Sequence, residues 1–334
     1  MREAMLYNRL ENNTVLCCLC PHACKIASGL AGICRVRKNN NGVLNTLNYS
    51  KAVAQNIDPI EKKPLYHFFP ATKAYSVAAP GCNFKCGFCQ NWQISQDFQA
   101  DILSLVSDVL PEHIVKCAKE ENCKSIAYTY TEPIVFFEYM YETAKLAQEE
   151  GIKNVLITNG FITQEALAQI IPYLDAVNVD LKSFNDDFYV KNCHGHLKPV
   201  LETIKCLKEN NVWTEVTTLV IPKCNDSLEE LRQIADFIVS IGKEIPWHIS
   251  RFHPEYHFTD YKATSLDVLD DAFKQAKLSG LDYVYLGNTE NKNNTCCAAC
   301  NVLLVRRYGF NVAENIIENS HCPSCGKFID GVFN

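Results

Sequence analysis

The sequence lacks any run of about 18 consecutive apolar residues, the minimum for a helix that spans a membrane. Its first residues, Met1 to Ala4, do not begin a secretory signal peptide. It also lacks a surplus of positive charge. The formal net charge is −6 at pH 7, which argues against broad electrostatic binding to nucleic acid. We therefore expect a cytoplasmic protein with no membrane partner and no indication of a nucleic-acid partner.

The residue type in surplus is cysteine. The chain has 334 residues, 47% apolar and 21% charged, which suffice for one large α/β domain with smaller appendages. Eighteen residues are cysteines, and thirteen of these fall into three spaced clusters. In a reducing compartment such spacing indicates metal ligation rather than disulfides.

The middle cluster has the spacing Cys82-x3-Cys86-x2-Cys89. Three thiolates leave one iron of a four-iron cluster without a protein ligand, and an open metal position can take a substrate or cofactor. Structural zinc sites normally use paired CxxC motifs and four protein ligands, so zinc fits this spacing poorly. The cluster follows a small apolar segment, residues 74–79, and is predicted to lie in the loop after a first strand.

This spacing, with the aromatic Phe88 before the last cysteine, resembles the signature of radical S-adenosylmethionine (radical SAM) enzymes. The resemblance implies that Cys82, Cys86 and Cys89 hold a [4Fe–4S] cluster and that S-adenosylmethionine (SAM) chelates its open iron. It also implies a low-potential electron donor of the flavodoxin or ferredoxin type. Reductive cleavage of SAM would then yield a 5′-deoxyadenosyl radical that abstracts hydrogen.

Apolar runs alternate with helical patterns through the centre of the chain. Strands are predicted near residues 74–79, 125–130, 154–159, 176–181, 213–221 and 247–252, and helices near 106–121, 133–150, 164–171, 199–210, 228–241 and 266–279. Asp226 is the expected N-cap of the fifth helix. Six successive βα units predict a parallel sheet with right-handed crossovers.

The competing architectures are a doubly wound open sheet and a barrel. The radical SAM resemblance favours an α/β fold with a partial (βα)6 barrel, whose active site lies at the carboxyl ends of the strands. An N-terminal cysteine-rich segment and a C-terminal zinc-ribbon-like module are predicted as appendages. The expected domains are residues 1–70, 71–288 and 289–334.

The second predicted strand ends in the run YTYTEP at residues 128–133. Many radical SAM enzymes have a GGE-like motif here that binds the SAM ammonium group. Thr131 and Glu132 are the matching candidates, although both glycines of the motif are missing. The alternative is a plain helix N-terminus, where a carboxylate before a proline is favoured by the helix dipole.

The next two strand ends carry Thr158-Asn159-Gly160 and Asp180-Leu181-Lys182. Both resemble motifs that line the SAM side of the barrel in activating enzymes for glycyl radical enzymes. Those enzymes usually have an acidic residue before the first motif, where this chain has Ile157. The resemblance therefore does not imply a bound monovalent cation in this chain. The alternatives are a tight turn and an exposed ion pair.

Arg251 and His253 end the sixth predicted strand and are further candidates for contact with SAM or substrate, although a lone histidine is more often structural. The run CHGH at residues 193–196 is interpreted as a solvated loop, with the substrate mouth as the alternative. Five cysteines lack partners at ligand spacing and are expected to be core or surface residues. They are Cys117, Cys123, Cys193, Cys206 and Cys224.

The two ends of the chain hold the other cysteine clusters. Two CxxC pairs separated by 21 residues near the C-terminus are typical of a zinc ribbon, with rubredoxin-like iron as the alternative. Four cysteines near the N-terminus predict a site for zinc or an auxiliary iron–sulfur cluster, with free thiols as the alternative. These ligands are Cys297, Cys300, Cys322 and Cys325 at one end, and Cys17, Cys20, Cys24 and Cys34 at the other.

The N-terminal motif, CNFKCGFCQNW, YTYTEP, VDLKS and the C-terminal cysteines together resemble the radical SAM component of the AmmeMemoRadiSam system. That subgroup is related to pyruvate formate-lyase activating enzymes, and the resemblance implies Memo-like and AMMECR-like proteins as companions. Three functions follow as hypotheses. The chain modifies a partner macromolecule or small substrate by hydrogen abstraction, activates a glycyl radical enzyme, or is a non-catalytic metal-bound interaction module.

Overall fold

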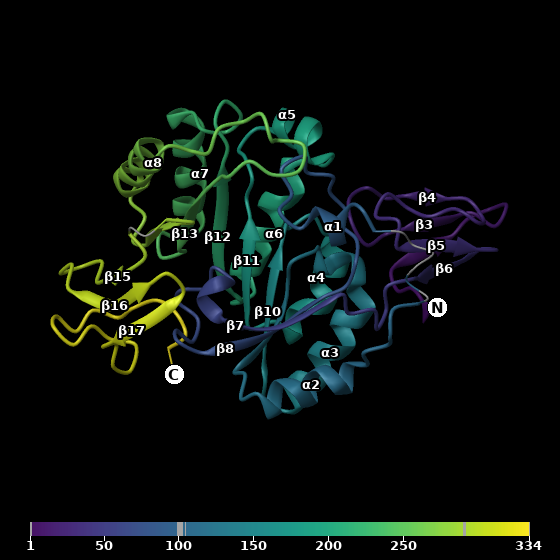
Figure 1. Cartoon of the computed structure of the whole chain (residues 1–334), viewed down its shortest axis with the longest axis horizontal. Helices are drawn as coiled ribbons and strands as arrows, with labels where there is room; N and C mark the ends of the chain where they lie inside the picture. The colour runs from purple at the N-terminus through teal and green to yellow at the C-terminus, as the bar shows by residue number, and fades with distance from the viewer. Residues whose placement is uncertain (1, 99–102, 104, 290–291, 334) are drawn as a thin grey trace.

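The computed structural model describes residues 2–98, 103, 105–289 and 292–333. Its centre is an eight-stranded sheet in the order β14-β13-β12-β11-β10-β9-β8-β7 (Figure 1). Strands β8 to β14 are parallel to one another, and β7 pairs antiparallel with β8. The bounds are β7 Ala54–Pro59, β8 Lys73–Ala78, β9 Ser125–Tyr128, β10 Lys153–Thr158, β11 Ala176–Asp180, β12 Trp213–Val220, β13 Trp247–Arg251 and β14 Val284–Gly287.

The strands lie across the sheet in chain order, so the order never reverses as it does in a doubly wound sheet. This confirms the predicted α/β class and all six predicted strands. Two further strands were missed. β14 has only four residues, and β7 is a polar edge strand, so neither gives the apolar run that marks a buried strand.

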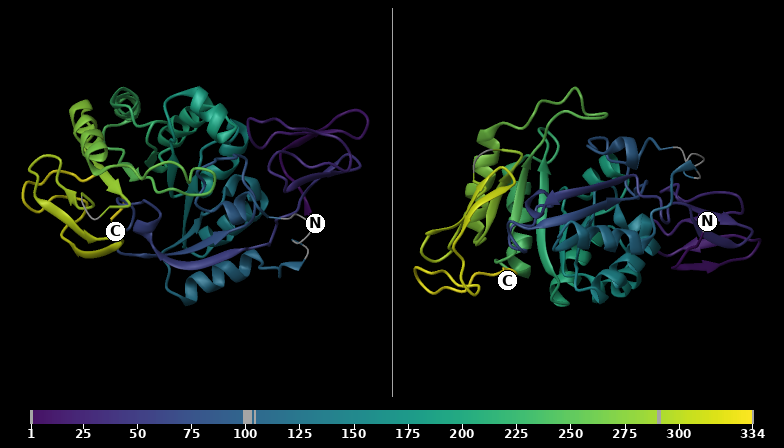
Figure 2. Two further views of the ribbon diagram at one scale, coloured as in Figure 1. Left: turned by 45° about the horizontal axis from the view of Figure 1, so that its top comes forward. Right: turned by 60° about the horizontal axis from the view of Figure 1, so that its bottom comes forward.

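The main helices lie along the outer side of the curved sheet (Figure 2). Among the described residues, no helix is both long and apolar enough to cross a membrane. The helical segments are η1 Ile60–Lys62, α1 Trp92–Ser95, α2 Pro111–Glu120, η3 Pro133–Phe136, α3 Phe137–Glu149, α4 Gln164–Ile170, η4 Ile171–Tyr173, α5 Asp186–Phe188, η5 Tyr189–Cys193, α6 Leu197–Glu209, α7 Leu228–Ile241 and α8 Leu266–Ser279.

The predicted N-cap of α7 is wrong by one residue. Ser227 caps the helix, because its hydroxyl accepts a hydrogen bond of 3.3 Å from the amide of Glu230. Asp226 instead accepts a hydrogen bond of 2.9 Å from the amide of Lys223, in the preceding turn.

Two small modules flank the sheet at opposite sides of the molecule (Figure 1). The head, residues 2–50, has the sheets β1-β6-β5 and β2-β3-β4, and the tail, residues 292–333, has the sheet β15-β16-β17. Their bounds are β1 Arg2–Glu3, β2 Tyr7–Arg9, β3 Val15–Cys17, β4 Lys25–Ile26, β5 Arg37–Asn40, β6 Val43–Thr46, β15 Thr295–Cys296, β16 Leu303–Tyr308 and β17 Asn311–Asn315.

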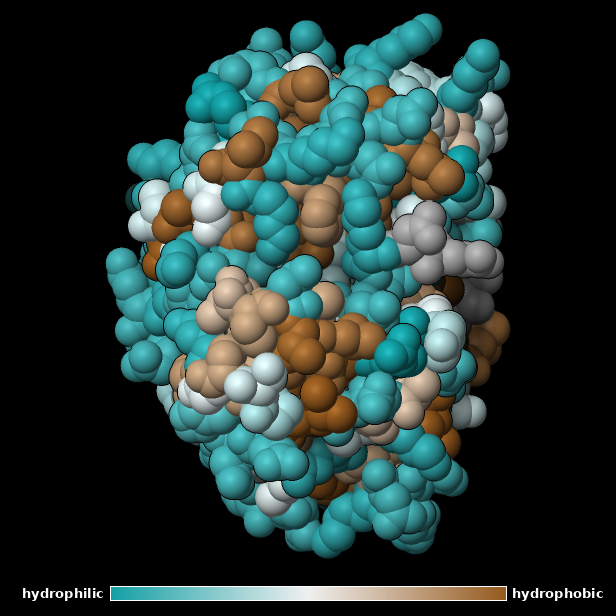
Figure 3. All heavy atoms as spheres, turned by 90° about the vertical axis from the view of Figure 1, so that its left-hand side faces the viewer, coloured by the Kyte–Doolittle hydropathy of each residue, from teal (hydrophilic) through white to brown (hydrophobic). Residues whose placement is uncertain are grey.

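The domain limits remain predictions, and residues 290–291 at the start of the predicted C-terminal module lie outside the described residues. The central sheet takes in β7, which belongs to the predicted segment 1–70. On the side of the molecule where the tail lies, apolar residues gather near the middle of the exposed face (Figure 3). The tail exposes three large aromatic side chains, Tyr308, Phe310 and Phe328.

Candidate active site

A cavity of about 860 Å³ opens at the carboxyl ends of the parallel strands. Ligand sites typically span about 300–1,000 Å³, so this cavity is a large one. It is lined by the three cysteines after β8, by polar residues that end β9, β10 and β11, and by Phe310 of the tail. This cavity lies where the site was predicted, at the strand ends.

The three cysteines lie in the cysteine loop, residues 79–91, which follows β8. The loop is fixed from behind by η5, because the amides of Lys85 and Gly87 donate to the carbonyls of Cys193 (2.8 Å) and Asn192 (3.2 Å). Gly87 is required here, since a β-carbon on it would lie 2.7 Å from the Phe258 ring. The conformation of the loop therefore depends both on its own residue Gly87 and on hydrogen bonds to η5.

Cys82, Cys86 and Cys89 all face one cavity but do not form a site for a single ion. Among the described residues, only the four tail cysteines bring three or more ligand atoms within 4.8 Å of one another. The loop cysteines instead surround open space, with the amide of Phe84 donating to the Cys82 sulfur at 3.3 Å. This donor set fits a polynuclear cluster with one side open to the cavity.

Cys193, expected to lack a partner, is a buried neighbour of the loop. The Cys193 thiol is the largest influence on the Cys86 thiol and lowers the pKa of Cys86. In the predicted solvated run 193–196, only His194 and His196 are exposed, whereas Gly195 packs against the ring of Phe84. That interpretation is half wrong, because η5 turns Cys193 inward.

Glu132 lines the cavity and is only 3% exposed. Its carboxylate accepts hydrogen bonds from the Thr158 hydroxyl (2.6 Å), the Asn159 amide (2.8 Å) and the Ile134 amide (3.2 Å). Burial raises its pKa to about 7, although these hydrogen bonds oppose the rise. Glu132 is thus also the helix cap that the alternative interpretation proposed, and it joins the end of β9 to the end of β10.

The Thr158-Asn159-Gly160 turn connects Glu132 to the cysteine loop. The Asn159 side chain donates to the Asn83 side-chain oxygen at 2.8 Å and contacts the Cys82 sulfur at 3.8 Å. Thr158 and Asn159 line the cavity. Gly160 has φ +72°, and a β-carbon there would lie 2.9 Å from Val179, so its role is in the turn.

Asp180 and Lys182 meet at the cavity wall, where their charged groups are 2.9 Å apart. Lys182 is the more buried partner, with 14% of its side chain exposed, and its ammonium lies 6.0 Å from the centre of the Phe88 ring. Phe88 and Thr131 also line the cavity. This pair is partly shielded from water, unlike the exposed ion pair of the alternative interpretation.

The structure does not bring Arg251 or His253 to the cavity. The Arg251 side chain donates to the carbonyl of Thr264 at 2.8 Å, and His253 is exposed. Arg251 is the last residue of β13 and, because side chains alternate along a strand, points to the face opposite that of Ser250; His253 lies beyond the end of β13. The inner face of that strand is presented by His248 and Ser250, which do line the cavity.

Other cavity residues were missed by the sequence analysis. Thr217 on β12 lies opposite Asp180 on β11, and His248 on β13 lies opposite Thr217. Because side chains alternate between the two faces of a strand, the residues on the same face as Asp180 could have been predicted from the sequence. Lys63, which also lines the cavity, is paired at 2.6 Å with Asp58, and burial lowers its pKa to about 8. Lys63 comes from the connection between β7 and β8, for which the sequence offers no signal.

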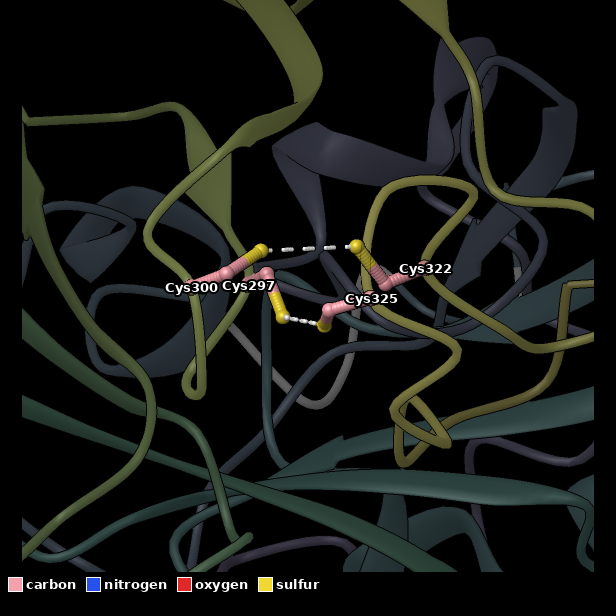
Figure 4. A group of neighbouring side chains, drawn as sticks. All are labelled: Cys297, Cys300, Cys322 and Cys325. Atoms are coloured by element: carbon pink, nitrogen blue, oxygen red, sulfur yellow. Dashed lines mark hydrogen bonds between the residues drawn. The ribbon is translucent and has the colours of Figure 1, made fainter.

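The tail cysteines form a compact group (Figure 4). The sulfurs of Cys297 and Cys325 are 3.6 Å apart, and those of Cys300 and Cys322 are 3.7 Å apart. Four sulfurs at about 2.3 Å from one zinc ion would be roughly 3.8 Å apart in a tetrahedron. The group therefore fits one metal ion with four thiolate ligands. The four head cysteines do not form such a single-ion group.

Comparisons with known proteins show what the chain is similar to. The radical SAM superfamily model matches residues 76–238. The chain is 46% identical to uncharacterized protein MJ0808 of Methanocaldococcus jannaschii over 335 residues, with 99% of each chain covered. It is 22% identical over 201 residues to the pyruvate formate-lyase-activating enzyme of Clostridium pasteurianum, covering 57% of this chain and 82% of that one.

Streptococcus suis SuiB, solved with S-adenosylmethionine bound, shares the fold with a TM-score of 0.50 and 13% identity. The match covers 69% of this chain and 53% of SuiB. The chain belongs to the radical SAM superfamily and is an enzyme. Membership implies a [4Fe–4S] cluster and SAM, which excludes the hypothesis of a non-catalytic interaction module.

Proposed function

We propose that this enzyme cleaves SAM in the cavity at the strand ends and uses the radical to abstract hydrogen from a partner macromolecule. The observation that carries the proposal is the convergence of Cys82, Cys86 and Cys89 with the polar ends of β9, β10 and β11 on one cavity. When bound, the cluster supplies the electron that cleaves SAM into methionine and a 5′-deoxyadenosyl radical.

The chain's own residues would bind and orient SAM. The Glu132 carboxylate lies beside the open side of the cysteine loop, where it can accept from an ammonium group in addition to its protein donors. The Asp180–Lys182 pair offers one anionic and one cationic group to the same cavity. Phe88, buried below the Lys182 ammonium, helps to exclude water.

The cavity extends from the cysteine loop to the tail, which supports a second occupant beside SAM. Phe310 lines the cavity and is 45% exposed, so it connects the cavity to the outer face of the tail. A partner bound to this face would have access to the cavity. The resemblance to the AmmeMemoRadiSam system supports Memo-like and AMMECR-like proteins as companions, together with a low-potential flavodoxin or ferredoxin.

We also propose that the tail metal is zinc, because the sulfur spacing and the two CxxC pairs match a tetrathiolate zinc site. A cytoplasmic location is consistent with these sites, since all eighteen cysteines are free in the structure and metal-binding thiolates need a reducing compartment.

A second candidate function is activation of a glycyl radical enzyme. The similarity to the Clostridium pasteurianum activating enzyme supports it, and so do Thr158, Asn159, Asp180 and Lys182, which line the cavity. In that case the radical would be stored on the backbone of the partner instead of being consumed in a bond-forming step.

Anaerobic pull-down with the reconstituted chain, followed by mass spectrometry, tests the partner. The recovered partner is then added to enzyme, SAM and dithionite. A rise in 5′-deoxyadenosine with a covalent mass change in the partner supports the first function. A persistent organic radical on the partner, seen by electron paramagnetic resonance, supports the second. A partner that changes neither signal contradicts both.

A further inference from the structure

The cavity has a second group of polar residues, to which the proposed SAM contacts assign no role. Glu61, Tyr66, Thr217 and Asn293 all line the cavity. They come from the connection between β7 and β8, from β12 and from the start of the tail. These four residues form the tail-side group.

Arg307, on β16 of the tail, holds three of these residues together. Its guanidinium donates to the backbone carbonyls of Tyr66 at 2.8 Å and Asn293 at 3.1 Å. Its Nε lies 3.7 Å from the Glu61 carboxylate, and its central carbon lies 4.3 Å from the centre of the Tyr66 ring. One buried side chain therefore gathers Glu61, Tyr66 and Asn293 around itself.

Thr217 joins the group from the sheet. It lies opposite His248 across β12 and β13, and the His248 ring packs edge-on against the Tyr66 ring, with the ring centres 4.7 Å apart. Glu215, on the same face of β12 as Thr217, accepts a hydrogen bond of 3.0 Å from the Tyr66 amide. The connection that carries Tyr66 is thus fixed against the strand that carries Thr217.

Three of the four residues hold a buried oxygen that has no hydrogen-bond partner within the described ranges. These atoms are Glu61 Oε2, Thr217 Oγ1 and Asn293 Oδ1. The other oxygen of Glu61 accepts from the Ala71 amide at 3.0 Å, and the side-chain nitrogen of Asn293 donates to the Thr289 carbonyl at 3.0 Å. Because buried polar groups are nearly always hydrogen-bonded, a partner that enters the cavity is expected.

The Tyr66 side chain offers a fourth polar group. The residue is only 5% exposed, and its hydroxyl hydrogen-bonds no residue in the part of the chain that the structure describes. The hydroxyl is nevertheless not one of the fully enclosed oxygens. It therefore opens onto the cavity that Tyr66 lines.

These four groups match the hydrogen-bonding pattern of a carboxamide. The Glu61 carboxylate and the Asn293 oxygen can only accept, whereas the hydroxyls of Tyr66 and Thr217 can donate or accept. A carboxamide has two N–H donors and a carbonyl oxygen with two lone pairs, so it offers two hydrogen bonds of each kind. An anion would instead meet two groups that can only accept.

The charges beside the tail-side group already have partners. Glu61 is paired with Arg307 at 3.7 Å, and Lys63 is paired with Asp58 at 2.6 Å. Lys62, the second cation beside Asp58, is 45% exposed and is therefore solvated. A charged ligand group would be desolvated here without a counter-ion, which favours an uncharged one.

We propose that the tail-side group binds an uncharged carboxamide of the substrate, such as the side chain of an asparagine or glutamine in a polypeptide partner. The inference rests on the proposed function, because the bound amide would hold the substrate in the same cavity as SAM. The tail would then form part of the substrate site through Asn293 and Arg307.

Three small probes of nearly the same shape test the class of ligand. Acetamide is uncharged, acetate is an anion and acetamidinium is a cation. Their binding to the anaerobically reconstituted full chain with SAM, without reductant, is measured by saturation-transfer difference NMR on the methyl group of each probe. Acetamide should bind at least about tenfold more tightly than either ion, a factor that one or two lost hydrogen bonds account for. Equal binding of the three probes, stronger binding of an ion, or no binding of acetamide would overturn the proposal.

Two variants locate the binding. Tyr66→Phe removes only the hydroxyl and should weaken acetamide binding about fivefold or more. Asn293→Asp adds an anion and should reverse the preference from acetamide to acetamidinium, which a merely structural role would not do. Tyr283→Phe is the matched control, because the Tyr283 hydroxyl is also buried but the residue does not line the cavity. Acetamide binding that is unchanged in Tyr66→Phe, or weakened equally in Tyr283→Phe, would refute the site.

Formation of 5′-deoxyadenosine after addition of dithionite to the same wild-type sample separates the two proposals. A wild type that cleaves SAM but does not bind acetamide refutes the carboxamide site and leaves the proposed function standing. A wild type that binds acetamide selectively but cleaves no SAM supports the site and contradicts the proposed function.

Discussion

The Glu132 carboxylate accepts a 2.6 Å hydrogen bond from the Thr158 hydroxyl, so the ends of β9 and β10 are tied together at the cavity wall. The neighbouring Asn159 continues this connection to Asn83 and Cys82 in the cysteine loop. The residue expected to contact SAM therefore also supports the shape of the site.

Replacing Glu132 by Ala should weaken SAM binding more than it lowers iron content. The substitution removes an anion from the cavity and leaves three buried donors unpaired, at a cost of about 1–3 kcal/mol each. We expect the Kd for SAM to rise at least about tenfold, the equivalent of 1.4 kcal/mol. Thr158→Val is the control, because it removes one donor and keeps the carboxylate. Parallel losses of SAM affinity and iron would argue against a SAM contact.

Asp58 should make the stability of the protein sensitive to acid. Burial alone would raise its pKa, but hydrogen bonds from Lys62, Lys63 and Tyr130 hold the pKa well below its usual value. The stabilisation is therefore present above about pH 4 and is lost as the pH falls below that value.

We expect Asp58→Asn to lower the free energy of unfolding near neutral pH by about 1–3 kcal/mol. The difference from the wild type should shrink in urea titrations near pH 3. Lys62→Ala should cost less than Lys63→Ala, because the Lys62 side chain is 45% exposed and that of Lys63 is 2% exposed. A difference between wild type and Asp58→Asn that does not change with pH would contradict this assignment.

Loss of one tail cysteine should release the tail metal without affecting iron. Zinc binding contributes on the order of 10–16 kcal/mol to small thiolate modules, so Cys300→Ser should leave the tail open to proteolysis. Cys296→Ser is the matched control, since this adjacent cysteine lies outside the four-sulfur group. Zinc and iron measured on the same samples decide the outcome. Retention of zinc by Cys300→Ser would contradict the four-ligand site.

Cys193 should tune the reduction potential of the active-site cluster. Hydrogen bonds to cluster sulfurs stabilise the reduced state, and the buried Cys193 thiol lowers the pKa of Cys86, as a hydrogen-bond donor to that sulfur would. We expect Cys193→Ala to shift the potential by tens of millivolts to more negative values in a titration followed by electron paramagnetic resonance. Cys206→Ala, on the outer helix α6, should leave it in place. An unchanged potential in Cys193→Ala would show that the bond is lost when the cluster binds.

The grouping of the three loop cysteines and the position of the strand ends could be predicted because their signals are local. Spacing alone brings Cys82, Cys86 and Cys89 into one loop, and parallel strands bring Glu132 and Asp180 to the same edge of the sheet. Neither inference depends on how distant segments pack.

The features that were missed depend on tertiary packing. β7 is polar because it is an edge strand, and Cys193 reaches Cys86 only because η5 folds back over the cysteine loop. Arg251 was placed at the site by its position in the sequence, but it follows the cavity-facing Ser250 on β13, so its side chain points to the other face and donates to the carbonyl of Thr264. Lys63 and Phe310 enter the cavity from outside the βα units, where periodicity carries no information.

Formation of 5′-deoxyadenosine by the anaerobically reconstituted chain, with dithionite and SAM, tests the central claim most directly. The wild type should produce it, and Cys82→Ala should produce none above the level without enzyme, while both proteins retain the tail metal. Equal production by the two proteins, or none by a wild type that carries its full complement of iron, would contradict the assignment of the three loop cysteines to a SAM-cleaving cluster.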